Sequence, residues 1–449
     1  MARAKKEAAL TPEERLQAAL VPDWEWPYKL PENWCWTTVG AINQYVGISA
    51  DPTKAKNKTF ELYSVPSSAD NYPEIVLGAD IGSTKQSVKK GDVLLCKINP
   101  RINRVWKVSK YTDHSLLASS EWIVIRNSGL ISNYLMWCFR SPYFRGYMLS
   151  NVSGVGGSLM RAQPKFVQGY PVPVPPLAEQ QRIVDRIESL FAKLDEAKEK
   201  AQAVVDSFET RKAAILHKAF TGELTAKWRE EHDVGMESWE KYKFNELGTL
   251  ERGRSKHRPR NDPKLFGGKY PFIQTGDVAR SGMYITEHTQ TLSEVGAEQS
   301  KLFPKGTLCI TIAANIGDVS ILTYDCCFPD SVVGFTPNER TLSEYIYYLM
   351  STLQREIEAN APATAQKNIN LRILNDLQLD IPSVAEQTQI VNQVEYLFFQ
   401  EQHAKEAAEA VLEQIDLMKK SILARAFRGE LGTNDPSEES AVELLKQIF

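Results

Sequence analysis

The chain has 449 residues, 43% hydrophobic and 24% charged, with a formal net charge of −3. These fractions are ordinary for a protein of two or three globular domains. No apolar run of the sequence approaches the length of a bilayer span, which excludes a membrane-embedded chain.

The charge is unevenly distributed along the chain. Residues 80–111 contain eight Lys/Arg against two Asp, and residues 241–280 contain ten Lys/Arg against four Asp/Glu. Residues 386–446 contain six Lys/Arg against twelve Asp/Glu. Two basic segments separated from an acidic one predict that particular parts of the chain bind phosphates.

The first twenty residues form an arm that lacks the apolar core of a signal peptide. Thr11, Pro12 and Glu14 predict a short capped helix in this arm. The six cysteines show no metal-ligand spacing and lie mostly in apolar runs. We therefore expect reduced core cysteines, no metal site and a cytoplasmic protein.

The first globular domain is expected over residues 21–175, as a mixed α/β domain. Short strands are predicted near residues 92–98, 121–126 and 172–174, and helical structure is predicted over residues 133–149.

One stretch follows this domain and is repeated later in the chain. PPLAEQQRIVDRIESLFA begins at Pro175, and PSVAEQTQIVNQVEYLFF begins at Pro382. The copies close with ILHKAFTGEL from Ile215 and ILARAFRGEL from Ile422, so the offset is 207 residues at both ends. A continuous helix cannot gain a residue without rotating its apolar face. The constant offset therefore predicts two long helices, within residues 176–224 and 382–431.

Each helix carries a narrow heptad seam with one polar interruption. The seam residues that we predict to form a coiled-coil interface are Ile183, Ile187, Leu190, Leu194, Val204, Phe208, Arg211 and Ile215 in the first helix, and Ile390, Val394, Leu397, Glu401, Val411, Ile415, Met418 and Ile422 in the second.

An isolated apolar stripe usually packs on its own globular neighbour. Two copies of equal length instead favour pairing of the helices with each other, and an antiparallel pair would hold two globular units apart. One register places Arg211 opposite Glu401, so that the two polar interruptions compensate each other. A second register, also in phase, places Arg211 opposite Val394.

The second globular domain is expected over residues 225–381 and repeats the plan of the first. Trp34 has a counterpart in Trp239, and Val39-Gly40 matches Leu247-Gly248. Lys90-Gly91 before VLLCKI matches Lys305-Gly306 before TLCITI. The sequences diverge between these anchors, which indicates one scaffold with two sets of loops. An acidic tail, residues 432–449, ends the chain.

The chain resembles the DNA-specificity subunits of type I restriction-modification enzymes. The resemblance rests on the two AEQ motifs with their long helices, on AFTGELT at Ala219 and AFRGEL at Ala426, and on GGKYPFIQTGDV from Gly267. It covers the chain from about Leu30 to Leu431.

The resemblance implies two target-recognition domains, each reading one half of a bipartite, asymmetric site in double-stranded DNA. It also implies an antiparallel coiled coil whose length sets the spacer between the halves. The subunit would be non-catalytic and would bind two adenine-N6 methyltransferase subunits and, through them, two motor and nuclease subunits. S-adenosylmethionine, ATP and Mg would be bound by those partners, in the cytoplasm of a bacterium or archaeon and close to the nucleoid.

The residues themselves give no sign of catalysis. The chain contains no G-x-x-x-x-G-K-[ST] phosphate loop. Asn99-Pro100-Arg101 is not an adenine methyltransferase signature, and Pro329-Asp330 lacks a Glu-x-Lys at nuclease spacing. These differences favour a binding subunit.

Two basic segments are the candidate DNA-binding residues, because Lys and Arg contact phosphates and Arg and Asn can read base edges. In the first domain they are Lys97, Asn99, Arg101, Asn103, Arg104 and Lys107; in the second they are Arg252, Arg254, Lys256, Arg258 and Arg260. Either segment could instead be a solvated loop, and part of the first could be a core strand.

Two other functions would fit some of these features. A coiled-coil adaptor would join two protein ligands without DNA, and a stand-alone nuclease would cleave DNA with a metal. Salt-dependent DNA binding distinguishes the specificity subunit from the adaptor, and metal-dependent cleavage by the chain alone would identify the nuclease.

Overall fold

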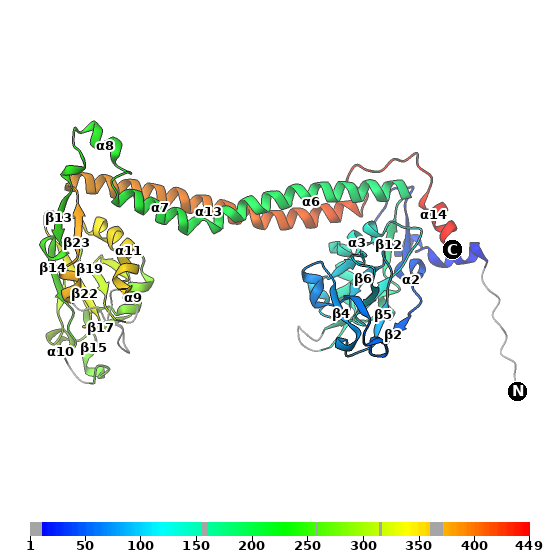
Figure 1. Cartoon of the computed structure of the whole chain (residues 1–449), viewed down its shortest axis with the longest axis horizontal. Helices are drawn as coiled ribbons and strands as arrows, with labels where there is room; N and C mark the ends of the chain where they lie inside the picture. Colours follow the sequence, from blue (N-terminus) through cyan, green and yellow to red (C-terminus); the bar gives the residue numbers. More distant parts are fainter. Residues whose placement is uncertain (1–10, 155–159, 257–258, 314–316, 360–370) are drawn as a thin grey trace. The chain divides into compact units, whose positions relative to one another are not determined.

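The computed structural model describes residues 11–154, 160–256, 259–313, 317–359 and 371–449. The chain divides into two compact units (Figure 1). Unit 1 comprises residues 1–201 and 410–449, and unit 2 comprises residues 202–409. The division therefore runs through both long helices and not at their ends.

Unit 1 contains an α/β domain. Its elements are α1 Pro12–Ala19, β1 Cys35–Thr38, α2 Val39–Ile42, β2 Ser49–Ala50, β3 Thr59–Tyr63, β4 Glu74–Leu77, β5 Lys85–Ser87, β6 Val93–Cys96, β7 Val105–Lys107, β8 Ser115–Ala118, β9 Trp122–Ile125, α3 Ser132–Arg140, α4 Pro142–Ser150, β10 Val152–Ser153, β11 Arg161–Ala162, α5 Pro164–Val167, β12 Pro171–Val174 and α14 Ala441–Ile448. Its sheets have the strand orders β1-β12, β2-β5-β8-β3-β4, β7-β6-β9 and β10-β11.

Local sequence explains the helix boundaries in unit 1. The predicted capping box at α1 is present: the Thr11 hydroxyl accepts from the Glu14 amide, and the Glu14 carboxylate accepts from the Thr11 amide. The helical structure expected over residues 133–149 is present, as two helices, α3 and α4. Pro142 cannot continue a helix but suits the first turn of a new one, and Ser141 caps that turn by accepting from Phe144 N at 3.2 Å.

Unit 2 repeats the α/β plan. Its elements are α7 Phe208–Phe220, α8 Ala226–Glu231, β13 Glu240–Lys243, β14 Gly248–Arg252, β15 Phe266–Phe272, α9 Thr275–Arg280, β16 Tyr284–Ile285, β17 Gln290–Leu292, α10 Glu294–Glu298, β18 Leu302–Phe303, β19 Leu308–Thr311, β20 Val319–Leu322, β21 Cys326–Cys327, β22 Val332–Pro337, α11 Ser343–Ala359, α12 Leu371–Asn375 and β23 Gln378–Ile381. Its sheets have the orders β13-β23, β14-β22-β19-β20-β16 and β17-β15-β21-β18.

The strand pairing confirms the internal repeat. In each unit the first strand of the domain pairs antiparallel with the strand that leads into a long helix: β1 with β12 and β13 with β23. Each unit also has a central strand with two antiparallel neighbours, the first of which is its hairpin partner. In unit 1 the strand β6 lies between β7 and β9, and in unit 2 the strand β19 lies between β20 and β22. Two of the anchors that the sequence indicated precede equivalent strands: Trp34 and Trp239 precede β1 and β13, and Lys90-Gly91 and Lys305-Gly306 precede β6 and β19.

The two long helices differ in continuity. The second, α13 Val384–Ala426, is unbroken, whereas the first is divided at Ser207 into α6 Leu177–Asp206 and α7. The prediction of two equally continuous helices was therefore wrong for the first copy. The Ser207 hydroxyl donates to Ala203 O at 2.5 Å, and the Arg211 guanidinium donates to Val204 O at 3.1 Å. Such side-chain bonds to helix carbonyls compete with the regular ladder and bend helices.

In unit 2 the helix pair is antiparallel. Lys405 lies 4.7 Å from the Phe208 ring centroid, and Lys212 lies 5.0 Å from that of Phe398. The predicted ion pair is present between them, with Arg211 Nε 2.5 Å from Glu401 Oε2. The register that joins the two polar interruptions is therefore the one adopted at this layer, and the alternative with Val394 opposite Arg211 is not.

In unit 1, α6 also contacts α13: Lys419 forms an ion pair with Asp195 and lies 5.1 Å from the Phe191 ring centroid. The predicted seam is wrong at Val411 and Met418, whose side chains are 45% and 47% exposed. The neighbouring residues Leu412 and Lys419 are less exposed. A straight helix drifts by about 20° per heptad against a strict seven-residue repeat. This drift moves the contact from Val411 and Met418 to the next residue of each, while Ile415 between them stays buried.

The last segment of the chain is a structured part of unit 1 and not merely an acidic tail. Leu445 is fully buried in the unit 1 core. Asn33 binds the segment twice, by accepting from Ala441 N at 2.9 Å and by donating to Asp435 O at 3.0 Å. The segment therefore completes the first domain.

All six cysteines are free and buried. Burial raises the pKa of Cys35 and of Cys326 to about 12. These thiols are core side chains, as the sequence predicted.

Candidate nucleic-acid interface

The basic loop of the second domain follows β14. Its backbone is fixed to the start of β22, where Gly253 N donates to Val332 O at 2.9 Å, and to the loop before β22, where Arg254 N donates to Phe328 O at 3.2 Å. A Cβ at Gly253 would lie 2.3 Å from Pro329 O. Only glycine allows this approach, so the loop leaves the sheet along a fixed path.

The predicted basic residues of this loop fall into two groups. Asp330 holds the first group: its carbonyl oxygen accepts from Arg252 Nε, and its carboxylate accepts from Arg260 Nη2 at 2.8 and 2.9 Å. Arg254 and Lys256 form the second group, and both are exposed. Arg258 lies outside the described residues. Arg254 and Lys256 are thus the members best placed for phosphate contact, which stays a prediction.

A pocket of about 160 Å³, lined by both polar and apolar side chains, adjoins this loop. Ser255 and Arg260 of the loop line it together with Gln274 and Gln299. The Gln299 side-chain oxygen also accepts from Lys256 N at 2.7 Å. Amide side chains therefore lie beside the cations, in the combination that reads base edges next to phosphates.

The basic segment of the first domain forms the β6–β7 hairpin. Its turn holds Asn99 and Asn103 in the left-handed region, with φ of 46° and 53°, a conformation that asparagine tolerates better than most residues. The Asn103 side chain donates to Arg140 O at 3.2 Å. The structure thus gives these asparagines a part in the turn, and their contact with bases remains untested.

The cations of this hairpin are less available than those of the second domain. Lys107 Nζ donates to Asn133 Oδ1 at 2.5 Å, against helix α3. Lys97 and Arg104 are half-buried, and Arg101 is exposed at the turn. Arg101 is therefore the member of this set with the freest side chain.

The two predicted sets lie on loops that do not correspond. The first lies in the β6–β7 hairpin, whose counterpart is the β19–β20 hairpin. The second set follows β14, which pairs with β22. The strand of unit 1 that is equivalent to β22 is β9. The segment beside the end of β9 includes Gln44, whose backbone amide donates to Arg126 O at 2.8 Å. The segment that leads from there to β3, residues 44–58, contains the exposed Lys54, Lys56 and Lys58. The two predicted sets therefore lie on different loops, although the first domain also has lysines on the loop that corresponds to the second set.

The AEQ motifs have a structural role that the sequence did not reveal. Trp34 Nε1 donates to Glu179 Oε2 at 3.0 Å, and Trp239 Nε1 donates to Glu386 Oε2 at 3.1 Å. All four residues belong to the repeated sequence pattern, and matched tryptophans with matched glutamates were the available signal. The motif ties the start of each long helix to the entry of its own domain.

The glutamine of each motif fixes a second helix. Gln180 accepts from Ile131 N, and Gln387 accepts from Leu342 N, each at 3.0 Å. Both glutamines also donate to the carbonyl oxygen of the proline five residues upstream in the chain. These bonds place α3 and α11 against the long helices in the same way in both units.

The two glutamates differ in their remaining partners. Glu386 accepts from Arg229 Nη1 at 2.6 Å, and both side chains are buried. Glu179 accepts instead from the Thr433 hydroxyl at 3.2 Å, and burial, opposed by the bonds from Trp34 and Thr433, raises its pKa.

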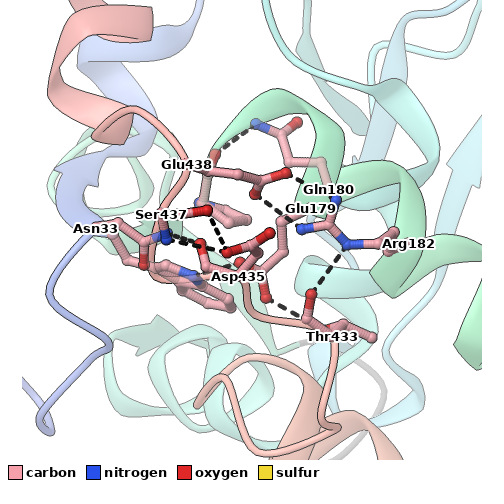
Figure 2. Close-up of polar contacts among 10 residues, drawn as sticks. Asn33, Glu179, Gln180, Arg182, Thr433, Asp435, Ser437 and Glu438 are labelled. Atoms are coloured by element: carbon pink, nitrogen blue, oxygen red, sulfur yellow. Dashed lines mark hydrogen bonds and ion pairs between the residues drawn. The ribbon is translucent and has the colours of Figure 1, made fainter.

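Figure 2 shows the cation that lies nearby in unit 1. The Arg182 guanidinium contacts Thr433 O at 2.9 Å and both carboxylate oxygens of Glu438 at 2.8 Å. Arg182 therefore holds the C-terminal segment and does not take the place of Arg229.

Neither a metal centre nor a membrane span occurs in the described parts of the chain. There, no group of three or more His, Cys, Asp or Glu side chains could hold a metal ion. Of the described helices, none has both the length and the apolarity that crossing a bilayer requires.

Comparison with known proteins gives a consistent family. A family model described as the type I restriction modification DNA specificity domain matches residues 47–205 and 236–411. The EcoKI specificity subunit of Escherichia coli K12 is 26% identical over 351 residues, which is 72% of this chain and 73% of that protein. The StySPI specificity subunit of Salmonella potsdam is 24% identical over 341 residues, 70% and 71% of the two chains.

A solved structure shares the fold. The HsdS subunit from Thermoanaerobacter tengcongensis superposes with a TM-score of 0.68 at 22% identity, covering 91% of this chain and all of that one.

Proposed function

Because the chain belongs to the type I restriction-modification DNA specificity family, and is a DNA sequence-specificity subunit, we propose that it reads a bipartite, asymmetric DNA site. Each recognition domain reads one half. The helices between the domains set the length of the spacer that neither domain reads.

One observation carries this proposal: the family model matches twice, once in each domain. Both matches fold on the same strand pairing, yet their loops differ in sequence. Identical domains would read identical half-sites. Two domains that share a scaffold and differ in loop chemistry suit two different half-sites.

The partners of such a subunit are double-stranded DNA and catalytic subunits. In the proposed assembly two adenine-N6 methyltransferase subunits dock on this chain, and two motor and nuclease subunits join through them. This chain is the non-catalytic member. S-adenosylmethionine, ATP and Mg belong to the other subunits, and the complex acts on DNA in the cytoplasm of a bacterium or archaeon.

The test is to co-express the chain with its methyltransferase subunit and to sequence the methylated adenines of the host DNA. A motif of two different half-sites at a fixed spacing is expected. A single short motif, a symmetric motif, or no methylation from an intact complex would contradict the proposal.

A second measurement separates this function from a protein adaptor. The purified complex should bind DNA fragments with an affinity that falls steeply with salt, because each phosphate contact releases a counterion. An adaptor would form the complex and show no such binding.

A further inference from the structure

The two recognition domains contain the same four-stranded arrangement. In unit 1, β3 pairs antiparallel with β4 and parallel with β8, and β8 pairs antiparallel with β5. In unit 2, β15 pairs antiparallel with β17 and parallel with β21, and β21 pairs antiparallel with β18. Strand pairing therefore identifies equivalent positions without relying on sequence similarity.

One pair of equivalent positions carries different hydrogen-bonding groups. Leu62 faces Glu74 across the β3–β4 ladder, and Phe272 faces Gln290 across the β15–β17 ladder. Two residues after Leu62, the Ser64 hydroxyl donates to Glu74 Oε1. Two residues after Phe272, Gln274 Nε2 donates to Gln290 Oε1 at 2.8 Å. We call this end of the β3–β4 or β15–β17 ladder the corner of the domain. The corner holds a hydroxyl–carboxylate pair in the first domain and an amide–amide pair in the second.

Both corners are rigid on the inside. Leu62 and Phe272 are 6% and 8% exposed, so the strand below each polar pair is anchored in a core. Gln274 is also fixed at its backbone, because its amide donates to the buried Asp277 carboxylate at 2.8 Å. Preorganised polar groups lose less conformational entropy on binding.

The outer sides of the corners are open. Gln274, Gln290 and Glu74 are exposed. Figure 1 shows β15 and β17 at the end of unit 2 that is remote from α7, and β4 at the end of unit 1 that is remote from α6. Gln274 also lines the pocket that it shares with Arg260 of the basic loop. A duplex held by Arg254 and Lys256 would therefore bring base edges close to this corner.

The chemistry of the two pairs suits different bases. A glutamine amide can donate and accept at once, which matches the N6 and N7 edge of adenine, whereas a carboxylate accepts from the cytosine N4 amino group. The Gln274–Gln290 bond engages one amino group and one carbonyl oxygen. The Gln290 amino group is a donor that this bond does not engage.

From this equivalence we infer that Gln274 and Gln290 read a base pair in the half-site of the second domain, and that Ser64 and Glu74 read one in the half-site of the first. This inference rests on the proposed bipartite recognition and names the residues that carry part of it. The amide pair selects adenine and the hydroxyl–carboxylate pair selects cytosine.

The test replaces the second pair with the chemistry of the first. The double variant Gln274→Ser with Gln290→Glu is co-expressed with the methyltransferase subunit, and the methylated adenines are sequenced. The matched control is Gln17→Glu, which makes the same change of charge at an exposed glutamine of α1. The first half-site and the spacer, read from the same molecules, serve as internal controls for folding and assembly.

We expect the preference at one base pair of the second half-site to fall by about tenfold or more, or to move from adenine to cytosine. The first half-site and the spacer should not change. The inference would be overturned if the double variant methylated DNA at the same second half-site with the same base preference at every position. If the wild-type complex gives no bipartite motif, the proposed function itself fails, which is a separate outcome.

If the double variant gives no methylation at all, its DNA binding is measured instead. The variant complex is titrated with duplexes that carry each base in turn at each position of the second half-site. A changed order of preference at one position supports the inference, and the wild-type order at every position overturns it.

Discussion

Glu179 and Glu386 show how the same residue at equivalent positions can meet different electrostatic surroundings. Both accept from the equivalent tryptophan. Glu386 also faces the buried Arg229 guanidinium, whereas Glu179 faces the Thr433 hydroxyl. The hydrogen bond from tryptophan to glutamate is therefore present in both units, whereas only in unit 2 does a buried arginine contact the glutamate in the described structure.

Glu386→Gln should destabilise unit 2 by about 3–5 kcal/mol, because it leaves the Arg229 charge buried without a counter-charge. Urea unfolding followed by circular dichroism measures the loss. Glu179→Gln is the matched control, since no buried arginine contacts Glu179 in the described structure, and its loss should be clearly smaller. Equal losses for the two variants would contradict this interpretation.

The raised pKa of Glu179 predicts a pH dependence. Burial disfavours the ionised carboxylate, so the folded state binds the Glu179 proton more tightly than the unfolded state, whose pKa is near 4.5. The stability from this group is fully present below pH 4.5 and is lost as the pH rises through the folded pKa. Relative to Glu179→Gln, the wild type should therefore lose unfolding free energy as the pH rises above 4.5. Parallel stability curves for the two proteins would contradict this.

The basic loop after β14 makes a prediction at the scale of one element. Arg254 and Lys256 are exposed, while Arg252 and Arg260 are bonded to Asp330. Replacing both exposed cations by alanine should lower the slope of log affinity against log salt by roughly 2, because each phosphate that is no longer neutralised removes about 0.9 from the slope. Gel shifts of the complex at several salt concentrations measure the slope.

The control for the loop is a second pair of exposed cations, Lys193 and Lys198 on α6. Their replacement by alanine should leave the slope unchanged. An equal effect of both double variants would show that the loop has no special part in phosphate binding.

Helix α14 makes a second prediction at this scale. Leu445 is fully buried in the unit 1 core, so Leu445→Ala should cost about 2–5 kcal/mol of unfolding free energy. The exposed neighbour Gln447 on the same helix provides a control variant, Gln447→Ala, with little expected effect. Thermal or urea unfolding of the full chain measures both. A small effect at Leu445 would mean that the C-terminal segment does not support the core.

Some elements could be predicted from the sequence, and the reason is physical. Period and spacing predict the long helices and their antiparallel contact, because a helix converts residue number directly into a position on its face. They left two registers open, and the structure adopts the one that pairs Arg211 with Glu401. The same argument was wrong at Ser207 and at Val411. There, side-chain bonds to carbonyls and the drift of a straight helix decide the outcome, and neither is visible in a heptad pattern.

The candidate interface could be predicted only in part. Composition identified both basic segments, but it could not show that Asn103 bonds to Arg140 O or that Asp330 holds Arg252 and Arg260. Those facts depend on contacts between residues distant in sequence. The amide pair Gln274–Gln290 was missed for the same reason, since it becomes meaningful only through the strand pairing.

At the scale of the whole molecule, the proposed function links helix length to spacer length. Inserting one heptad after Ala197 and one after Ala404, which are equivalent positions, would lengthen the helical pair by roughly 10 Å at about 1.5 Å per residue. The spacer in the methylation motif should grow by about three base pairs at about 3.4 Å each, with both half-sites unchanged. Adding a heptad to only one helix breaks the pairing and should abolish methylation. An unchanged spacer with both heptads present would contradict the proposed role of the helices.

The burial of every cysteine makes the chain convenient for chemical labelling. Thiols react as thiolates, and burial keeps these six protonated and shielded. A cysteine introduced at an exposed site would therefore be the preferred target of a maleimide or a nitroxide reagent. Spin labels on one such cysteine in each unit, at exposed positions away from the residues proposed to read DNA, would report the distance between the two units by pulsed electron resonance, with and without a duplex.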